Sequence, residues 1–264
     1  MQTSMGIERA LRVIYYVAGP HEERRSDFGV SEVARSLDLS KTVVHRILTT
    51  LVAIDFLAVD PDTRRYRLGP GAVIVGHAAL EQIDPYRVAH PYMEKLASET
   101  GETIAFSIRR GGERVYIDQI VSEAEVRMTV QVGDASPLHA GSPAKAILAA
   151  IPQADAEEYL NHQNSLVRFT DQTITDRRAL ARDLEEVRRL GYAVSYGERQ
   201  AYAFSVAGPI LQAGGSVFGA ISICGPAQRF DEKRGVRYGE LLRDAAKQIS
   251  WELGYQGDWF DTDS

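Results

Sequence analysis

The sequence predicts an α+β fold, with a small winged helix-turn-helix domain followed by a larger domain in which helices flank an antiparallel sheet. Three observations lead to this expectation. Residues 30–57 have the pattern of two short helices joined by a brief turn. Farther along, strand-like runs alternate with glycine-containing turns and helical segments. A chain of 264 residues is also long for one small domain and suits two.

The helix-turn-helix interpretation depends on apolar spacing and on two serines. Apolar residues recur at helical spacing in both halves, at Val30, Val33, Ala34 and Leu37 and then at Val43, Ile47, Leu48 and Leu51. Asp38 and Leu39 interrupt the pattern. Ser31 and Ser40 suit the two N-cap positions, because a serine oxygen can accept a hydrogen bond from an unpaired N–H of the first turn.

The outward face of the second helix predicts contact with DNA. Its side chains are hydrogen-bond donors and small hydroxyls, which reach phosphates and base edges when a helix N-terminus enters a major groove. These candidate DNA-binding residues are Ser40, Lys41, Thr42, His45, Arg46 and Thr49. The competing interpretation is a generic three-helix core with a solvated hairpin.

A β-hairpin wing is expected next. Residues 56–59 and 64–68 have the pattern of short strands around a Pro/Asp turn. Alternation places Arg65 and Arg67 on one face of the second strand, and Tyr66 and Leu68 on the other, apolar face that would cover the helices. The basic side, which also includes Arg64, could lie along a phosphate backbone.

The charge distribution and the single cysteine limit which functions the chain can have. The net charge is −6, but residues 1–70 hold ten Lys or Arg against nine Asp or Glu, so the acidity belongs to the rest of the chain. A near-neutral first domain with clustered basic residues can bind DNA as a dimer, which doubles the phosphate contacts. The single cysteine excludes an internal disulfide. Without a leader-like segment or a long apolar run, we expect a cytoplasmic protein without a membrane partner.

Two further helices are expected around the winged domain. Residues 5–18 place Ile7, Leu11, Ile14, Tyr15 and Ala18 on one stripe that would pack under the helix-turn-helix. Residues 72–83 are apolar on several sides, so a second copy of the chain is the simplest cover. We interpret this segment as a linker helix.

The larger domain is expected to begin at Asp84 and Pro85, an N-cap followed by a first-turn proline. Helices are predicted over residues 85–100, 155–162, 177–190 and 235–254, and another begins at Ser142. Strands are predicted over residues 102–109, 114–121, 125–132, 192–196, 204–211 and 217–224. The predicted organisation is a winged domain (1–70), a linker helix (71–83), an effector domain (84–256) and an acidic tail that frays (257–264).

Eight segments, in order along the chain, resemble the IclR family of bacterial transcription regulators. They are ERALRVIYYVA, SEVARSLDLSKTVVHRILTTL, DTRRYRLGP, HPYMEKLASETGET, PLHAGSPAKAILA, FTDQTITD, VRRLGYAVSYGE and AISICGPAQRF. The resemblance implies a GAF-like effector domain after the winged domain and linker. It also implies a homodimer or homotetramer that binds palindromic promoter DNA, more often as a repressor, and that responds to a small molecule, often a carboxylate.

The resemblance also implies where the effector binds. The family's pocket lies between the sheet and the helix that follows the PLHA motif, and its positions here are Met128, Ser136, Ser142, Pro143, Ser195, Ala203, Ser205, Ser222 and Cys224. An N-terminal helix end and serine hydroxyls suit an anionic or amide-like group. The chain departs from the family at Pro143, which lacks an N–H, and at Ser195, which is acidic in some members. An aromatic carboxylate or hydrazide-like effector, with Phe106 and Tyr202 as further walls, is therefore favoured over a 2-oxo acid.

Other interpretations stay open at this point. His139 is a ligand group or a histidine bonded to backbone, Cys224 is a redox sensor or a buried core residue, and Lys145 contacts an anion or is ion-paired. Ser142, His139 and Asp134 could form a hydrolase site, although no glycine elbow surrounds the serine. A sensor or scaffold that binds no DNA is another alternative. We find no metal-ligand cluster or nucleotide loop, and we expect no cofactor.

Overall fold

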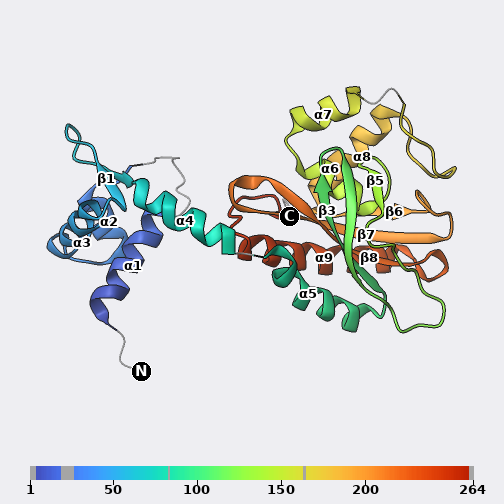
Figure 1. The fold of residues 1–264 in the computed structure, drawn as a ribbon, viewed down its shortest axis with the longest axis horizontal. Coiled ribbons are helices and arrows are strands. Elements are labelled where there is room, and N and C mark those ends of the chain that lie inside the picture. Colours follow the sequence, from blue (N-terminus) through green and yellow to red (C-terminus); the bar gives the residue numbers. More distant parts are fainter. Residues whose placement is uncertain (1–3, 19–26, 83, 163–164, 262–264) are drawn as a thin grey trace. The chain divides into compact units, whose positions relative to one another are not determined.

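The computed structural model describes residues 4–18, 27–82, 84–162 and 165–261 (Figure 1). The chain forms two compact units, Met1–Ile83 and Asp84–Ser264. Ile83, the last residue of the expected linker, and residues 262–264 of the expected tail lie outside the described residues. In the part of the chain that is described, no helix is long and apolar enough to cross a membrane.

The N-terminal unit contains the predicted winged helix-turn-helix. Its helices are α1 (Met5–Ala18), α2 (Val30–Leu37), α3 (Lys41–Ala53) and α4 (Pro70–Gln82), and its hairpin pairs β1 (Leu57–Val59) with β2 (Tyr66–Leu68). Asp38 ends α2 in the left-handed conformation, and the Ser40 hydroxyl accepts a hydrogen bond from the Val43 N–H, as expected for an N-cap.

Local details of this unit differ from the prediction. Gly29, and not Ser31, is the N-cap of α2, and the Glu32 carboxylate accepts from its N–H. On α3 it is Val44 that is buried, while Val43 is only partly covered. The predicted inward stripe of α1 is wrong. Val13 and Val17 face the core, whereas Ile7, Leu11, Tyr15 and Ala18 are exposed and Ile14 is half-buried.

The second unit is a six-stranded antiparallel sheet in the order β5-β4-β3-β8-β7-β6. Its strands are β3 (Thr103–Arg110), β4 (Glu113–Ile120), β5 (Ala135–Pro137), β6 (Ala193–Tyr196), β7 (Ala203–Leu211) and β8 (Val217–Pro226). Its helices are α5 (Pro85–Thr100), α6 (Ser142–Ala150), α7 (Gln153–His162), α8 (Arg177–Leu190) and α9 (Glu232–Glu252), with short 3₁₀ turns at Ala213–Gly215 and Ala227–Arg229. This is the predicted α+β class.

The sheet lies between two helical layers. In Figure 1, α5 and α9 cover one face, and α6 and α8 cover the other. Close approach of α9 depends on Gly208 of β7, because a Cβ there would lie 2.9 Å from the Ala246 Cβ. Asp84 and Asp176 cap α5 and α8 as predicted, each accepting from an N–H of the first turn.

The strand predicted over residues 125–132 does not form. Residues 121–134 cross from β4 to β5 without strand pairing, and the short strand β5 lies just beyond them. We call residues 121–134 the strap. Its apolar and β-branched residues fit the strand pattern, but side chains bind the backbone of Val126, Met128 and Val130, and only Gly133 and Asp134, among the described residues of the strap, bond to the backbone of β4, at Tyr116.

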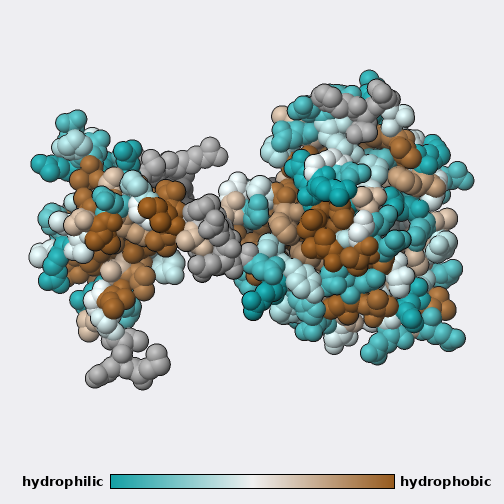
Figure 2. Space-filling model, viewed as in Figure 1, coloured by the Kyte–Doolittle hydropathy of each residue, from teal (hydrophilic) through white to brown (hydrophobic). Residues whose placement is uncertain are grey.

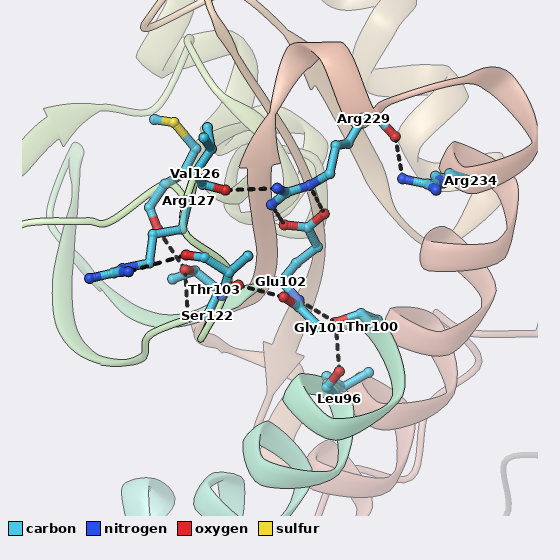
Figure 3. Close-up of polar contacts among 12 residues, drawn as sticks. Leu96, Thr100, Gly101, Glu102, Thr103, Ser122, Val126, Arg127, Arg229 and Arg234 are labelled. Carbon is cyan, nitrogen blue, oxygen red and sulfur yellow. Dashed lines mark hydrogen bonds and ion pairs between the residues drawn. The ribbon is translucent and has the colours of Figure 1, made fainter.

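Side chains of the sheet and of the 3₁₀ turn after β8 hold the strap at several points, two of which are drawn in Figure 3. Thr103 donates to the Met128 carbonyl at 2.5 Å, and Arg229 donates to the Val126 carbonyl at 2.7 Å. Arg229 also forms a two-pronged ion pair with the buried Glu102, at 2.9 and 2.6 Å. Outside that view, the Gln119 amide pairs with Val130 in both directions, donating at 2.7 Å and accepting at 2.9 Å.

The expected fraying of the tail is wrong for its described residues. Phe260 is buried and packs edge-on against Tyr255, and Lys247 of α9 pairs with Asp261 at 2.6 Å. Burial of the Phe260 side chain stabilises this segment against the unfolding that its acidic composition favours.

Candidate nucleic-acid interface and effector cavity

The outward face of α3 is a continuous polar surface. Val44, Leu48 and Leu51 fix the helix on the core of the N-terminal unit. All six predicted side chains on this helix are exposed, namely Ser40, Lys41, Thr42, His45, Arg46 and Thr49. The Thr49 hydroxyl donates to the His45 carbonyl at 2.8 Å, so its oxygen can still accept. The arrangement presents donors from a helix N-terminus, as required for major-groove reading.

The wing is a tight hairpin. The Asp60 carboxylate accepts from the N–H groups of Asp62 and Thr63 at 2.9 and 2.8 Å, and these bonds, that of Thr63 first, lower the pKa of Asp60. Arg64 adopts a positive φ of 57° at the end of the turn. Arg64 and Arg67 are exposed.

Arg65 differs from the other wing arginines. Its guanidinium pairs with the Asp27 carboxylate at 2.9 Å and with Glu32 at 3.2 Å, and it also donates to the Asp27 carbonyl at 2.8 Å. The side chain therefore fastens the wing to the start of α2. Tyr66 is buried as predicted, but Leu68 is exposed because β2 ends there.

In the second unit, a row of small polar side chains crosses the sheet. Ser195 of β6 pairs in register with Ser205 of β7, Ser205 with Cys224 of β8, and Cys224 with Thr103 of β3. Residues paired across antiparallel strands point to the same face. Three members of this row, Ser195, Ser205 and Cys224, line a cavity of about 390 Å³.

The N-terminus of α6 closes one side of this cavity. Gly141, with a φ of 87°, and Pro143 line it, and the Gly141 N–H donates to Glu198 at 3.1 Å. The Ser142 hydroxyl donates to that of Ser205 at 2.7 Å. The strap closes another side with Met128, Thr129, Val130, Gln131 and Asp134.

Arg114 brings an unpaired positive charge to the cavity. The residue is 2% exposed, and its guanidinium lies 3.7 Å from the centre of the Tyr116 ring. Nη2 donates to the Ser136 hydroxyl at 2.6 Å, whereas Nε and Nη1 have no hydrogen-bond partner among the described residues. Buried polar groups are normally satisfied, so Arg114 is an exception among the side chains around the cavity.

The other charges at the cavity are paired. Arg199 reaches Asp134 at 3.4 Å and lies over the Phe169 ring. Burial, and then the charge of Arg114, lower the pKa of Arg199. Glu198 pairs with the buried Lys145 at 2.6 Å.

Six of the nine predicted effector residues line the cavity, and three lie behind its wall. The lining residues are Met128, Pro143, Ser195, Ala203, Ser205 and Cys224. Ser136 holds Arg114, Ser142 holds Ser205, and Ser222 donates to the Ala105 carbonyl. Phe106 and Tyr202 do not line it. Phe106 packs with Tyr86 of α5 on the opposite face, and Tyr202 is exposed.

The charged lining residues were missed by sequence reasoning. Arg114, Glu198 and Arg199 each resemble an ordinary solvated residue of a strand or loop, since the pattern does not show which strands become central. One signal was available. Arg114 and Tyr116 stand two apart in a predicted strand, so they share one face of it.

His139, Cys224 and Lys145 each have buried surroundings. His139 Nε2 bonds to the Val167 carbonyl at 2.9 Å, and burial lowers the pKa of His139. Burial raises the pKa of the Cys224 thiol to about 11, which favours an unreactive thiol. Lys145 is ion-paired. The three groups of the hydrolase alternative, Ser142, His139 and Asp134, each bond to other partners.

Comparisons with known proteins match both units. Residues 6–61 match the IclR helix-turn-helix domain, and residues 77–251 match the bacterial transcriptional regulator IclR C-terminal domain. The chain belongs to the IclR family. As a family member it is a transcription regulator with a DNA-binding helix-turn-helix domain and an effector-binding domain.

Relatives of this IclR-family chain include a repressor and a ligand-bound structure. It is 36% identical to the HTH-type transcriptional repressor AllR of Escherichia coli K12, over 95% of this chain and 91% of that repressor. The crystal structure of Pseudomonas aeruginosa HmgR matches with 25% identity and a TM-score of 0.78, over 96% and 100% of the two chains. An IclR homologue from Microbacterium hydrocarbonoxydans, complexed with 4-hydroxybenzoate, matches with 26% identity and a TM-score of 0.56, over 94% and 99%.

Proposed function

We propose that the protein is a ligand-responsive repressor that binds palindromic promoter DNA through α3 and the wing. The exposed polar face of α3 carries this proposal, because it combines a capped helix N-terminus with donors at Lys41, His45 and Arg46. The identity to AllR, a repressor, supports the direction of regulation.

The proposed contacts fall into two groups. Ser40, Lys41, Thr42, His45, Arg46 and Thr49 enter the major groove, and Arg64 and Arg67 lie along the phosphates. Arg65 contributes by holding the wing in place through Asp27 and Glu32.

Fluorescence anisotropy with promoter fragments from the protein's own genomic neighbourhood tests DNA binding. Arg67→Ala, which removes a phosphate contact, is expected to weaken binding on all sequences and to reduce the salt-dependence slope by about 1. Arg46→Ala is expected to cost about 1–3 kcal/mol if it reads a base. Arg110→Ala, an exposed residue of the second unit, is the control. A scaffold without DNA affinity would show no difference among the three variants.

A second copy of the chain would complete the N-terminal unit. Along α1, Ile7, Leu11 and Tyr15 form an exposed apolar stripe, and Val73 and Ile74 of α4 are each 70% exposed. Figure 2 shows hydrophobic surface on the viewed face of this unit. Exposed apolar stripes of this kind mark interaction surfaces. A homodimer, or a homotetramer built from two dimers, would present two recognition helices to the two halves of a palindrome.

The cavity of the second unit is the proposed effector site. Its lining of serines and the α6 N-terminus suits a carboxylate-bearing or amide-like compound. The homologue that binds 4-hydroxybenzoate supports an aromatic acid as one candidate. We propose that effector binding acts through a linker helix (71–83) between a winged domain (1–70) and the effector domain (84–256), with residues 257–264 as a tail.

A further inference from the structure

We infer that the effector is a small organic monoanion whose carboxylate pairs with Arg114, which is therefore the residue that selects for charge. This inference rests on the proposed effector role of the cavity and adds the residue and the net charge that the ligand carries. The hydrogen bonds made by the charged side chains of the cavity wall support it.

The Arg114 guanidinium has N–H donors without a hydrogen-bond partner among the described residues. A guanidinium has five N–H groups, and Ser136 accepts one of them, from Nη2. The second hydrogen of Nη2 remains, together with those of Nε and Nη1. A carboxylate can therefore bind in a two-pronged fashion, to Nη2 and either neighbouring nitrogen.

The guanidinium is already held in position for such a ligand. Arg114 is paired in register with Ser136 of β5, and the Ser136 hydroxyl accepts a hydrogen bond from Nη2 of the guanidinium. The Tyr116 ring stacks beneath its plane at 3.7 Å. A side chain fixed in this way loses little further rotational freedom when an anion binds, which favours affinity.

The pairing of charges in the described lining leaves Arg114 without a charged partner. Among the four charged lining residues, Arg199 is balanced by Asp134, and Glu198 is balanced by Lys145 behind the wall. Both Glu198 oxygens are occupied, one by Lys145 and the other by the Gly141 N–H. Lys145 is shared between Glu198 and Asp183, and neither Lys145 nor Asp183 lines the cavity. Arg114 is the charge left over in the described lining.

A neutral ligand would leave Arg114 buried without a counter-charge, and a dianion would bring a second negative charge beside Asp134 and Glu198. Ser195, Ser205, Gln131 and Gln200 offer hydrogen bonds to hydroxyl or carbonyl groups on the rest of the molecule. The cavity of about 390 Å³ restricts the ligand to a small metabolite.

Thermal-shift titration of the full chain with matched probes tests this inference. The monoanions are acetate, pyruvate and 4-hydroxybenzoate, the neutral partners are acetamide, pyruvamide and 4-hydroxybenzamide, and the dianions are malonate and 4-hydroxyphthalate, all at constant ionic strength. We expect at least one monoanion to raise Tm in a saturable way, and its neutral partner and the dianions to be at least tenfold weaker.

Variants assign the effect to Arg114. Arg114→Met, which keeps the length but removes the charge, is expected to abolish the shift, and Arg114→Lys to retain part of it. Arg110→Met on the same hairpin, an exposed arginine outside the cavity, is the matched control. Because the removed charge is unpaired, Arg114→Met is expected to fold with a Tm no lower than that of the wild type without ligand.

Equal stabilisation by an amide and its acid, an unchanged response in Arg114→Met, or no shift from any monoanion at 20 mM would each overturn the inference. Promoter binding without ligand is measured in parallel for both proteins. If the wild type and Arg114→Met bind DNA alike while Arg114→Met keeps the anion response, the inference fails and the proposed function stands. If neither protein binds DNA but the anion shift depends on Arg114, the inference stands and the proposed function fails.

Discussion

At the scale of single residues, the buried pair of Lys145 and Glu198 connects α6 to the loop after β6. Lys145 is 1% exposed and also donates to the Val194 carbonyl at 2.9 Å. A buried pair contributes little beyond an apolar pair of similar shape, but loss of one partner leaves an uncompensated charge.

Lys145→Met is therefore expected to lower the free energy of unfolding of the second unit by about 3–5 kcal/mol. Chemical denaturation followed by circular dichroism measures this change. The double variant Lys145→Met/Glu198→Leu should recover part of the loss, because the buried Glu198 carboxylate is then not stranded and Asp183, the other partner of Lys145, is partly exposed. If the double variant is as unstable as the sum of the two single variants, the residues are not coupled.

His139 predicts a pH dependence of stability. Burial lowers its pKa in the folded protein, so the unfolded chain binds a proton more readily than the folded chain. Stability is expected to be fully present above the unfolded pKa of about 6.5 and to fall as the pH drops below it. Urea denaturation at pH 7.5 and pH 5.5 measures the loss, which should be smaller in His139→Gln. An equal loss in both proteins would contradict this assignment.

Residue identities were predictable from sequence where a local pattern fixes them, as at the caps Ser40, Asp84 and Asp176. The charged residues of the cavity were not predictable in this way. Arg114 lies between β3 and β5, and although its pairing with Arg109 is local, its pairing with Ser136 crosses the strap and is not visible in the local pattern. Arg65 shows the same limit, because its partners Asp27 and Glu32 lie more than thirty positions away.

At the scale of elements, the strap lines the cavity without pairing as a strand. Side-chain hydrogen bonds hold its middle, where the Gln119 amide replaces one rung of a β-ladder at Val130, and backbone bonds to Tyr116 hold its end at Gly133 and Asp134. Elements held in this way open more readily than strands in the centre of a sheet.

Gln119→Leu is expected to speed hydrogen exchange at the Val130 amide by about fivefold or more, since the net contribution of a hydrogen bond is about 1 kcal/mol. Exchange in β7 should not change. The matched control is Gln153→Leu, which removes an exposed amide at the start of α7. Unchanged protection at Val130 would show that other contacts hold the strap.

Five of the six predicted strands formed, because each carries an apolar face that the sheet buries. The run 125–132 has the same composition but no neighbour in the sheet. The error on α1 has a related cause. Apolar residues occupy two sides of this helix, and only the side with Val13 and Val17 meets the core of its own unit.

At the scale of the whole molecule, dimer formation is expected to depend on the exposed apolar residues of α1 and α4. Ile74→Glu should shift the protein toward monomer in analytical ultracentrifugation, since a buried unpaired carboxylate opposes association. It should also weaken operator binding by at least tenfold. Val167→Glu, at another exposed apolar position, is the control. A dimer that survives Ile74→Glu would place the interface elsewhere.

The central claim is that one unit binds operator DNA and the other controls that binding through a small anion. The most direct test is to measure both dissociation constants, each with and without the other ligand, using the promoter fragment and the monoanion selected by thermal shift. We expect the anion to weaken DNA binding by at least about fivefold, and DNA to weaken anion binding by the same factor, because linkage is reciprocal. If the anion does not change the dissociation constant for DNA, and DNA does not change that for the anion, the account is contradicted.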